Sequence, residues 1–382
     1  MALKNIVHIT HTDINNDWRI RKEIYAVLNV LNDSHTLSVF SIDSGLDVNP
    51  FSKPNVKAFN FKPPAFCGGL PKFLRLPLIL LLFSGYVLKN LNFKNVKVCH
   101  VHDTAVLHLG FIVKRFSNSL LIYDAHELES QKNMQSKIYS LVTLWLEKLF
   151  WSNIDVLISV SDGIIDWYNS SFSKKKSLLI LNSPDRVDLE KADNIVDLRD
   201  TYCLGSEKLF VHIGLLQSGR GIERLLEVFS ESEHRIVFLG FGILDELIRS
   251  YSDRYDNIHL YKHVPNHILV PTISSADYGI CTIENVSTSD YLALPNKYFE
   301  YLFAGLPVLV SNFPELEKYT LTYKVGFTTE LDMISIRDGV DKISKSDVNV
   351  NQSNIQELSW SAQSEKLGRL YIEILEDGFD DN

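Results

Sequence analysis

Residues 294–311 read Leu294-Pro295-Asn296-Lys297-Tyr298-Phe299-Glu300-Tyr301-Leu302-Phe303-Ala304-Gly305-Leu306-Pro307-Val308-Leu309-Val310-Ser311. A proline at the first turn and Gly305 just past the end predict a short helix that runs into an apolar strand. Asn296, Lys297 and Glu300 stand three and four positions apart, so their side chains can converge beside the helix N-terminus. A lysine, a carboxylate and free backbone N–H groups suit a phosphate next to a hydroxylated ring.

Outward from this stretch, strand-like runs alternate with helical patterns, which predicts a parallel α/β architecture. The strands expected in the first half are Ile6–Ile9, Thr36–Phe40, Val56–Phe59, Val96–His100, Leu120–Tyr123, Val156–Ser159 and Leu178–Leu181. Those expected in the second half are Leu209–Ile213, Arg235–Leu239, Ile258–Tyr261, Tyr278–Thr282 and Pro307–Val310.

A polar, charged stretch through Asp200 separates the two series. We therefore expect two Rossmann-like, doubly wound domains, residues 1–185 and 200–360, that face each other across a cleft for a large polar ligand. An amphipathic pattern from Trp360 to Leu375 predicts a long closing helix, with an acidic tail at Glu376–Asn382. We expect this C-terminal helix, about residues 362–382, to pack back on the first domain.

The composition narrows the classes of function. A chain of 382 residues is long enough for two domains, and its net charge of −9 argues against nucleic acid as a partner. Cys67, Cys99, Cys203 and Cys281 lie far apart, without the spacing of a zinc knuckle or a disulfide framework. The N-terminus lacks a signal-peptide pattern, so we expect a cytoplasmic protein.

The segment Leu76–Leu88 is almost wholly apolar and has the basic flanks Lys72, Arg75, Lys89, Lys94 and Lys97. Its length is too short for a membrane span and favours a buried helix of the first domain. The alternative is an interfacial helix, with residues 72–97 in peripheral contact with anionic lipid at the inner face of the membrane.

Three strand ends of the first domain carry functional groups. The first is followed by His8, His11, Asp13, Asp17, Arg19 and Arg21, the second by His100, His102 and Asp103, and the third by Asp124, His126 and Glu127. The carboxyl ends of parallel strands share one edge, so we expect these groups to meet. No metal-binding motif such as HExxH and no Asp-x-Asp pair suited to Mg²⁺ is present, which favours a site without metal or other cofactor.

In the second domain, the strand Leu209–Ile213 leads into Gly214-Leu215-Leu216-Gln217-Ser218-Gly219-Arg220-Gly221 and an amphipathic helix. Such a loop can direct N–H groups at an anion, and Arg220 adds a bidentate donor. Gly240 and Gly242 follow the next strand without the third glycine of a dinucleotide fingerprint, which disfavours a dehydrogenase. Arg220, Lys297 and a helix N-terminus are enough to hold a diphosphate without a metal.

Several motifs together resemble the retaining glycosyltransferases of family four, which have the GT-B fold and include bacterial enzymes of cell-surface polysaccharide synthesis. They are residues 102–107 (HDTAVL), 123–128 (YDAHEL), 182–184 (NSP), Gly214 with 220–223 (RGIE), 240–242 (GFG) and the stretch quoted first. These motifs occur in the family's order over about residues 1–320.

The resemblance implies a role for particular residues. Glu300 matches the glutamate that binds the donor ribose, Arg220 the basic residue on the donor diphosphate, and His102 the histidine that faces the donor sugar. His263 and Val264 stand where the family's loop meets the nucleobase. From the residues themselves we also expect Asp103 and Lys297 as catalytic groups, Gly214, Gly242 and Asn296 for donor binding, and Asp17, Arg19, His126 and Glu127 on the acceptor side.

This sequence also departs from the family pattern. Leu292 replaces the first motif glutamate, Leu215 replaces a frequent arginine, and Asp17-Trp18-Arg19-Ile20-Arg21 replaces the usual glycine-rich loop. We therefore expect sugar recognition to differ, with Asp290, Asn296 or backbone amides near Leu294 taking over.

The resemblance implies transfer of a sugar from a UDP- or GDP-linked donor to a saccharide or lipid-linked acceptor, with retention of configuration. Two alternatives stay open. The first is a sugar-nucleotide epimerase of the same fold, and the second is a catalytically silent binding partner, since Leu292 and Leu215 stand at two functional positions.

Overall fold

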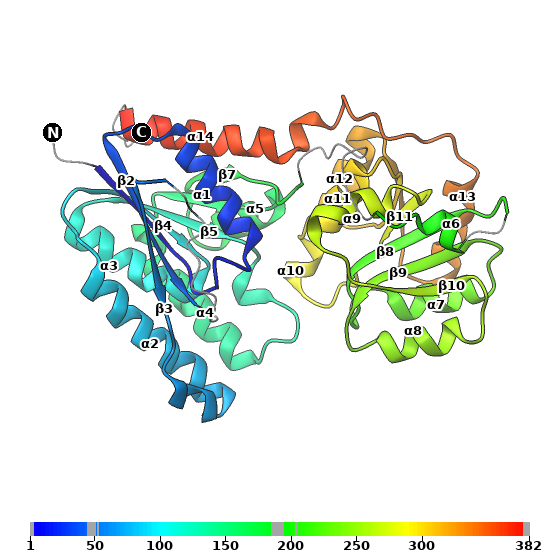
Figure 1. The fold of residues 1–382 in the computed structure, drawn as a ribbon, viewed down its shortest axis with the longest axis horizontal. Coiled ribbons are helices and arrows are strands. Elements are labelled where there is room, and N and C mark those ends of the chain that lie inside the picture. Colours follow the sequence, from blue (N-terminus) through cyan, green and yellow to red (C-terminus); the bar gives the residue numbers. More distant parts are fainter. Residues whose placement is uncertain (1–3, 44–50, 52, 185–194, 203–204, 377–382) are drawn as a thin grey trace. The chain divides into compact units, whose positions relative to one another are not determined.

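The computed structural model describes residues 4–43, 51, 53–184, 195–202 and 205–376. Cys203 and the acidic tail beyond Glu376 lie outside these residues. The chain forms two compact units (Figure 1): Met1–Ile180 with Gln363–Asn382 is unit 1, and Leu181–Ala362 is unit 2.

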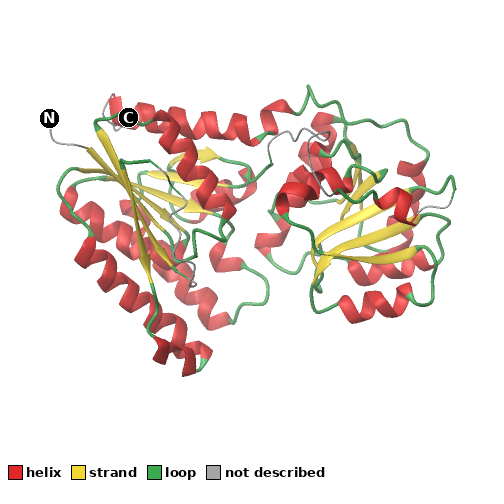
Figure 2. Cartoon of the chain, viewed as in Figure 1, coloured by secondary structure: helices red, strands yellow, loops and turns green. Residues whose placement is uncertain are grey.

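Unit 1 is built on a seven-stranded parallel sheet in the order β3-β2-β1-β4-β5-β6-β7 (Figure 2). The strands are β1 (Lys4–Ile9), β2 (His35–Ile42), β3 (Val56–Phe61), β4 (Val96–His102), β5 (Leu120–Ala125), β6 (Val156–Ser159) and β7 (Lys176–Leu179). The helices are α1 (Trp18–Val30), α2 (Lys72–Asn90), α3 (Leu107–Ser117), α4 (Lys137–Phe150), α5 (Asp162–Ser171) and α14 (Trp360–Glu376), and the 3₁₀ turns are η1 (Ala65–Gly69), η2 (Thr104–Val106), η3 (Glu129–Gln131) and η4 (Trp151–Asn153).

Unit 2 is built on a six-stranded parallel sheet in the order β10-β9-β8-β11-β12-β13. The strands are β8 (Leu209–Leu215), β9 (Arg235–Phe241), β10 (Ile258–Lys262), β11 (Tyr278–Cys281), β12 (Val308–Ser311) and β13 (Gly326–Thr329). The helices are α6 (Leu198–Tyr202), α7 (Ile222–Ser230), α8 (Asp245–Ser252), α9 (Asn266–Ile273), α10 (Thr288–Tyr291), α11 (Asn296–Phe303), α12 (Pro314–Tyr323) and α13 (Met333–Ser344), with the 3₁₀ turn η6 (Gln356–Leu358).

The central strands are continuous apolar runs because helices cover both faces of each sheet. All four residues of β6 are buried, as are Leu209 to Ile213 of β8. Helix starts follow local capping: Asp17, Ser136 and Ser161 each accept a hydrogen bond from a first-turn N–H of α1, α4 and α5. Both sheets therefore confirm the expected pair of doubly wound parallel α/β units.

The C-terminal helix α14 packs on unit 1, as expected. Tyr371 is fully buried there, and Lys4 Nζ of β1 donates to the Leu375 carbonyl oxygen at 2.9 Å. The last helix of the chain is thereby fixed to its first strand.

Several strands extend one or two residues beyond their predicted bounds, and three further differences concern β7, β13 and α2. Strand β7 ends at Leu179 rather than Leu181, and the edge strand β13 was not expected. Helix α2 extends from Lys72 to Asn90 and is mostly exposed, with only 17% of the window Phe73–Asn90 buried. The favoured prediction of a buried helix at Leu76–Leu88 is therefore wrong, because only one side of α2 packs on the fold.

Candidate functional site

In unit 1, the functional side chains lie where the strand order reverses. β1 has β2 on one side and β4 on the other, which makes the β1–β4 boundary the switch point of the sheet. The register places His8 of β1 opposite His100 of β4, and His102 of β4 opposite Asp124 of β5. The three polar strand ends expected from the sequence thus meet at one edge.

These groups form a continuous chain of hydrogen bonds. Asp124 Oδ2 lies 3.1 Å from His102 Nδ1, and His102 Nε2 lies 3.1 Å from His8 Nδ1. The chain continues from His8 Nε2 to the Tyr371 hydroxyl at 3.1 Å, and from that hydroxyl to His100 Nδ1 at 2.9 Å. Because an ionised carboxylate only accepts, His102 donates from Nδ1, His8 donates to His102, and Tyr371 donates to His8.

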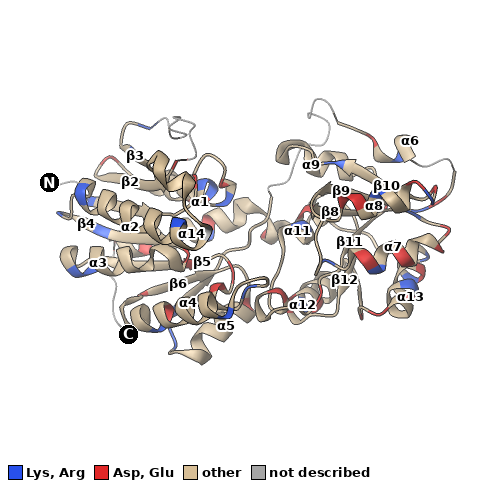
Figure 3. Ribbon diagram, turned by 90° about the horizontal axis from the view of Figure 1, so that it is seen from below, with Lys and Arg blue, Asp and Glu red and all other residues tan. Residues whose placement is uncertain are grey.

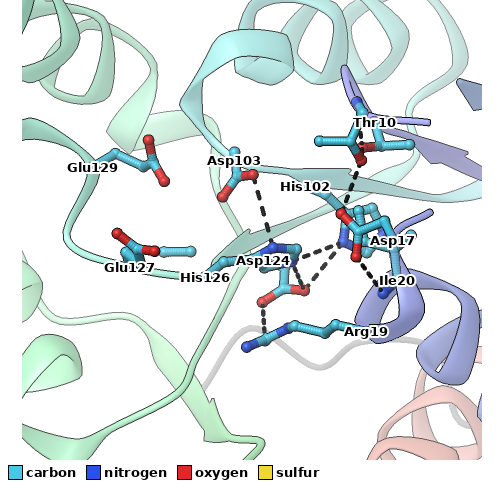
Figure 4. Close-up of polar contacts among 12 residues, drawn as sticks. Thr10, Asp17, Arg19, Ile20, His102, Asp103, Asp124, His126, Glu127 and Glu129 are labelled. Carbon is cyan, nitrogen blue, oxygen red and sulfur yellow. Dashed lines mark hydrogen bonds and ion pairs between the residues drawn. The ribbon is translucent and has the colours of Figure 1, made fainter. Parts of the chain in front are cut away.

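Arg19 is the cation that balances Asp124 (Figure 4). Its guanidinium donates to Asp124 Oδ1 at 3.0 Å and to Glu23 Oε1 at 2.9 Å, and all three side chains are buried. Burial raises the pKa of Asp124, but Arg19 and His126 outweigh it and hold this pKa well below its usual range. Burial and the Asp124 carboxylate raise the pKa of Glu23 well above its usual range, against the opposing effect of Arg19.

His126 and Asp103 form the more accessible part of the cluster. His126 Nε2 lies 3.0 Å from Asp124 Oδ2, and its Nδ1 lies 3.8 Å from Asp103 Oδ2. Burial lowers the pKa of His126, but the carboxylates of Asp103 and Asp124 reverse this effect and raise the pKa to about 9. His126 is therefore a cation at neutral pH, and the ions Arg19, Asp124, His126 and Asp103 sum to zero charge.

His102 is fully buried, with both ring nitrogens in hydrogen bonds. Burial and the neighbouring His100 lower its pKa to about 4, so the ring is neutral. The more accessible side chains of this cluster are those of His126 and Asp103, which are 14% and 10% exposed. The sugar contact expected of His102 itself stays a prediction.

Asp103 holds its carboxylate in a conformation that is unusual for any residue except glycine. Its φ is 68° and its ψ is 162°, and its Oδ1 is buried without a hydrogen-bond partner among the described residues. Its backbone N–H donates to the Asp124 carbonyl oxygen at 3.0 Å, which fixes the turn after β4 to the end of β5. Strain and a free acceptor at one residue are typical of a ligand-binding position.

The groups expected on the acceptor side lie in different surroundings. Asp17 caps α1 through Ile20 N–H and accepts from the Thr12 hydroxyl at 2.9 Å. Arg19 is committed to Asp124 and Glu23, and Glu127 is exposed beside Lys132 at 3.5 Å. Their contact with an acceptor stays a prediction.

Four buried ligand atoms of unit 1 are close enough to hold a metal ion. They belong to Glu23, His100, His102 and Asp124 and lie within 4.8 Å of one another; His8, His100 and His102 form an overlapping set. Arg19 already supplies positive charge to both carboxylates of the first set.

In unit 2, the switch point lies between β8 and β11, which pair only at Tyr278–Phe210 and Gly279–Val211 before they diverge. The Tyr301 hydroxyl of α11 bridges this gap: it accepts from Ile213 N–H at 2.9 Å and donates to the Ile280 carbonyl oxygen at 3.0 Å. The confirmed helix Asn296–Phe303, which Gly305 (φ 83°) follows, is thereby anchored at the strand ends.

Lys297 of α11 is a half-buried cation at this switch point. Its Nζ lies 3.5 Å from Nε2 of the buried His212 in β8, and among the described residues no carboxylate lies within ion-pair distance of it. Burial and the nearby Arg220 lower the pKa of Lys297, and Cys281 and Glu300 offset part of this effect. Burial, Lys297 and Arg220 lower the pKa of His212, so that ring is neutral.

Both the side chain and the backbone of Arg220 are held by neighbouring residues. Its Nη1 lies 3.0 Å from Asp290 Oδ1, and its carbonyl oxygen accepts from the Thr282 hydroxyl at 3.1 Å. Gly221 follows with φ 71°, and a Cβ there would lie 2.7 Å from Thr282 Oγ1. The glycine thus lets the Arg220 loop approach the end of β11.

The other residues expected to bind the donor differ in how far they are buried. Gly242 passes so close to Leu216 that a Cβ would lie 2.0 Å from the Leu216 carbonyl oxygen, whereas Gly214 (φ 107°) is exposed. Val264 is buried, while His263 is exposed beside the Phe241 ring at 5.5 Å. Asn296 is exposed on α11, and Glu300 is partly buried one turn later.

The structure also brings residues into these clusters that motif analysis did not place there. Tyr371 and Glu23 had no signal as site residues, and His212 stands inside an apolar strand. A titratable side chain within such a strand is itself a usable signal, since burial requires a partner.

Searches with the sequence found no matching protein-family model and no matching curated protein. Comparison with solved structures gives full-length matches. A sucrose-phosphate synthase from Thermosynechococcus elongatus has a TM-score of 0.73 at 15% identity, covering 98% of this chain and 100% of that one. The Anabaena protein HepE in complex with UDP and glucose has a TM-score of 0.66 at 11% identity, covering 96% and 99%.

The lipopolysaccharide outer core galactosyltransferase WaaB matches with a TM-score of 0.64 at 11% identity, covering 98% and 100%. The fold is that of the GT-B glycosyltransferases. At these identities the likeness concerns the fold, and the chemistry of this GT-B chain has to come from its own residues.

Proposed function

We propose that this protein is a retaining glycosyltransferase of family-four type that uses a nucleotide-diphosphate-sugar with a UDP or GDP base. Its acceptor is a saccharide or a lipid-linked saccharide of cell-surface polysaccharide synthesis, at the cytoplasmic face of the membrane. The observation that carries the proposal is Lys297, a half-buried cation beside neutral His212 and close to Arg220, for which no ion pair is seen among the described residues.

The chemistry of these groups suits a diphosphate leaving group. Burying a cation is unfavourable unless an anion compensates it, so the Lys297 site gains most from a ligand with concentrated negative charge. The N-terminus of α11 adds the positive end of a helix dipole, and Arg220 adds a fork of N–H donors. Glu300, one helical turn after Lys297, is suited to accept hydrogen bonds from the ribose hydroxyls.

Transfer then relies on electrostatic stabilisation of the departing diphosphate by residues of unit 2. No metal takes part in the proposed reaction, because Arg220 and Lys297 supply the compensating charge. The leaving phosphate accepts the proton of the acceptor hydroxyl. Retention of configuration follows if the acceptor attacks from the face that the phosphate leaves.

The accessible groups of unit 1 are proposed to act on the sugar and the acceptor. His126 is a cation that can only donate, while the Asp103 carboxylate can only accept. This pair can orient two hydroxyl groups of a sugar without itself removing a proton.

Donor binding provides the test. A panel of nucleotides and nucleotide-sugars is screened by the shift of Tm with wild-type protein, because a ligand stabilises the fold according to its occupancy. We expect UDP or GDP compounds to bind, and Lys297→Met to weaken binding about 10- to 100-fold by loss of charge-assisted hydrogen bonds. The matched control is Lys345→Met, at an exposed lysine of the same unit. Equal affinity in both variants contradicts the proposed donor site.

Turnover separates the transferase from its two alternatives. Incubation with the bound nucleotide-sugar alone yields a new sugar isomer only if the protein is an epimerase. Nucleotide binding without turnover across donors and acceptors is the result expected of a silent binding partner. Release of nucleotide that depends on an acceptor saccharide supports the transferase.

A further inference from the structure

Helices α2, α3 and α4 form one layer on unit 1, side by side in Figure 3. Ser84 Oγ of α2 lies 2.8 Å from His108 Nε2 of α3, and the rings of Phe111 in α3 and Phe150 in α4 are 5.2 Å apart. Buried side chains such as Phe83 fix the inner side of the layer to the fold. Its outer side is open to solvent.

The outer side of α4 carries an apolar stripe where a soluble helix normally has polar residues. Ile138, Leu141, Val142, Trp145 and Leu149 recur at spacings of three and four, and all are exposed. Ile138 is 76% exposed and Trp145 is 60% exposed. An exposed helical stripe of this size marks an interaction surface rather than scattered surface residues.

The stripe has a counterpart on the first turns of α2 and on the turn before it. Phe66 of η1 and Phe73, Leu74 and Leu76 of α2 are exposed, as is Leu81 one turn further on. Residues 73–77 of α2 are all exposed, so this end of the helix contributes little to the core of unit 1.

The charge of the layer is opposite to that of the whole chain. Helices α2 and α3 contain no Asp or Glu, and the single acid of α4, Glu147, is buried and bound to Tyr168 at 2.6 Å. Five exposed basic residues accompany the apolar ones, namely Arg75, Lys89, Arg115, Lys137 and Lys148. The chain as a whole has a net charge of −9.

We propose that the outer side of α2, α3 and α4, the docking face, binds to the surface of a bilayer that contains anionic lipid. Aromatic and aliphatic side chains among lysine and arginine fit the headgroup boundary, where apolar groups enter the lipid and basic groups meet its phosphates. A second copy of this face is disfavoured as the occupant, since pairing two such faces brings their basic residues together.

The docking face lies on the bilayer and does not cross it. By length and composition, Phe73–Asn90 is able to span a membrane. The same helix, however, holds Phe83, Ser84 and Val87 against the fold, and these contacts would be lost in a span. Contact through α4 extends the membrane-binding surface of the protein well beyond residues 72–97. This contact does not depend on a bound donor or acceptor.

Vesicle flotation tests the proposal with the full chain and two kinds of vesicle, phosphatidylcholine alone and phosphatidylcholine with phosphatidylglycerol. We expect binding that requires phosphatidylglycerol and weakens as salt is added. The double variant Leu141→Gln/Trp145→Gln should lower the partition coefficient at least about 10-fold. Lys137→Gln and Lys148→Gln should each lower it about fivefold.

The matched control is Ile243→Gln/Ile334→Gln, which removes two exposed apolar side chains of unit 2 and should leave flotation unchanged. All substituted side chains are exposed, so Tm and its shift by nucleotide should match wild type, which separates this test from that of the donor site. Equal flotation of the control and the α4 variant overturns the proposal. The proposal is also overturned if the wild-type protein is a dimer in sedimentation velocity, the α4 variant is a monomer, and the wild-type protein does not bind vesicles.

Discussion

The Tyr371 hydroxyl lies 3.1 Å from His8 Nε2, although 363 positions separate the two residues in the chain. The same hydroxyl contacts His100 Nδ1 at 2.9 Å, so one atom of the C-terminal helix joins both histidines at the switch point of the sheet. Helix α14 is thus part of the polar cluster as well as of the hydrophobic core.

Tyr371→Phe should lower the free energy of unfolding by about 1–3 kcal/mol, because it leaves two buried imidazole nitrogens without their partner. Urea denaturation of the variant measures this loss. Tyr323→Phe is the control, since it removes a hydroxyl that bonds to Glu357 at the surface. A loss for Tyr371→Phe no larger than that of the control would contradict the hydrogen-bond chain.

The raised pKa of His126 predicts a dependence of stability on pH. Its pKa rises from 6.5 to about 9 on folding, so its contribution is complete below pH 6.5 and is lost as pH rises through 9. The free energy of unfolding should therefore fall over this window, by up to about 3 kcal/mol from this group.

His126→Gln keeps a donor for Asp124 and removes the titration, so the decline between pH 6.5 and 9 should become shallower. Urea denaturation at several pH values measures both slopes. His263→Gln, at an exposed histidine of unit 2, should keep the wild-type slope. An unchanged slope in His126→Gln would rule out this residue as the source.

We predict that a side chain at residue 242, a position expected to bind the donor, lowers the stability of unit 2. A Cβ at Gly242 would lie 2.0 Å from the Leu216 carbonyl oxygen, and that oxygen already accepts from Leu244 N–H at 3.0 Å. Gly242→Ala must shift backbone and should destabilise unit 2 by about 1–3 kcal/mol, with weaker nucleotide binding as a consequence.

Gly85→Ala provides the opposite control. Gly85 stands within α2, and a Cβ there meets no atom within 4 Å. Alanine should stabilise the helix by about 0.5–1 kcal/mol. Thermal unfolding distinguishes the two variants, and a stable Gly242→Ala would show that the loop tolerates displacement.

Much of the fold follows from local patterns in the sequence. Continuous apolar runs such as Val156–Ser159 predict strands buried on both faces, and Pro295 with Gly305 predicts the limits of α11. The meeting of His100, His102 and Asp124 also follows, because parallel strands end at the same edge.

Other features depend on tertiary contacts that local patterns do not specify. Tyr371 reaches His8 only because α14 returns to β1, and Lys297 approaches His212 only because Tyr301 anchors α11 between β8 and β11. Strand β13, Gly-Phe-Thr-Thr, has no apolar run to mark it. The apolar spacing of α2 identifies a helix but does not tell whether protein or lipid covers it.

We predict that Asp103 lowers the stability of the fold and is needed for activity. Its φ of 68° and ψ of 162° lie in a region that glycine adopts freely and other residues occupy at a cost of about 1–3 kcal/mol. Asp103→Gly removes this strain together with the carboxylate near His126. It should unfold at an equal or higher urea concentration than wild type while its turnover falls about 100-fold or more.

Two further variants separate strain from charge. Asp103→Ala loses the carboxylate but keeps the unfavourable φ, so it should be less stable than Asp103→Gly and equally inactive. Asn118→Gly changes a residue at φ 55° that ends α3, where asparagine is tolerated, and should alter stability and turnover little. If Asp103→Ala and Asp103→Gly unfold at the same urea concentration, the backbone at residue 103 is not strained, and the position is held by its carboxylate alone.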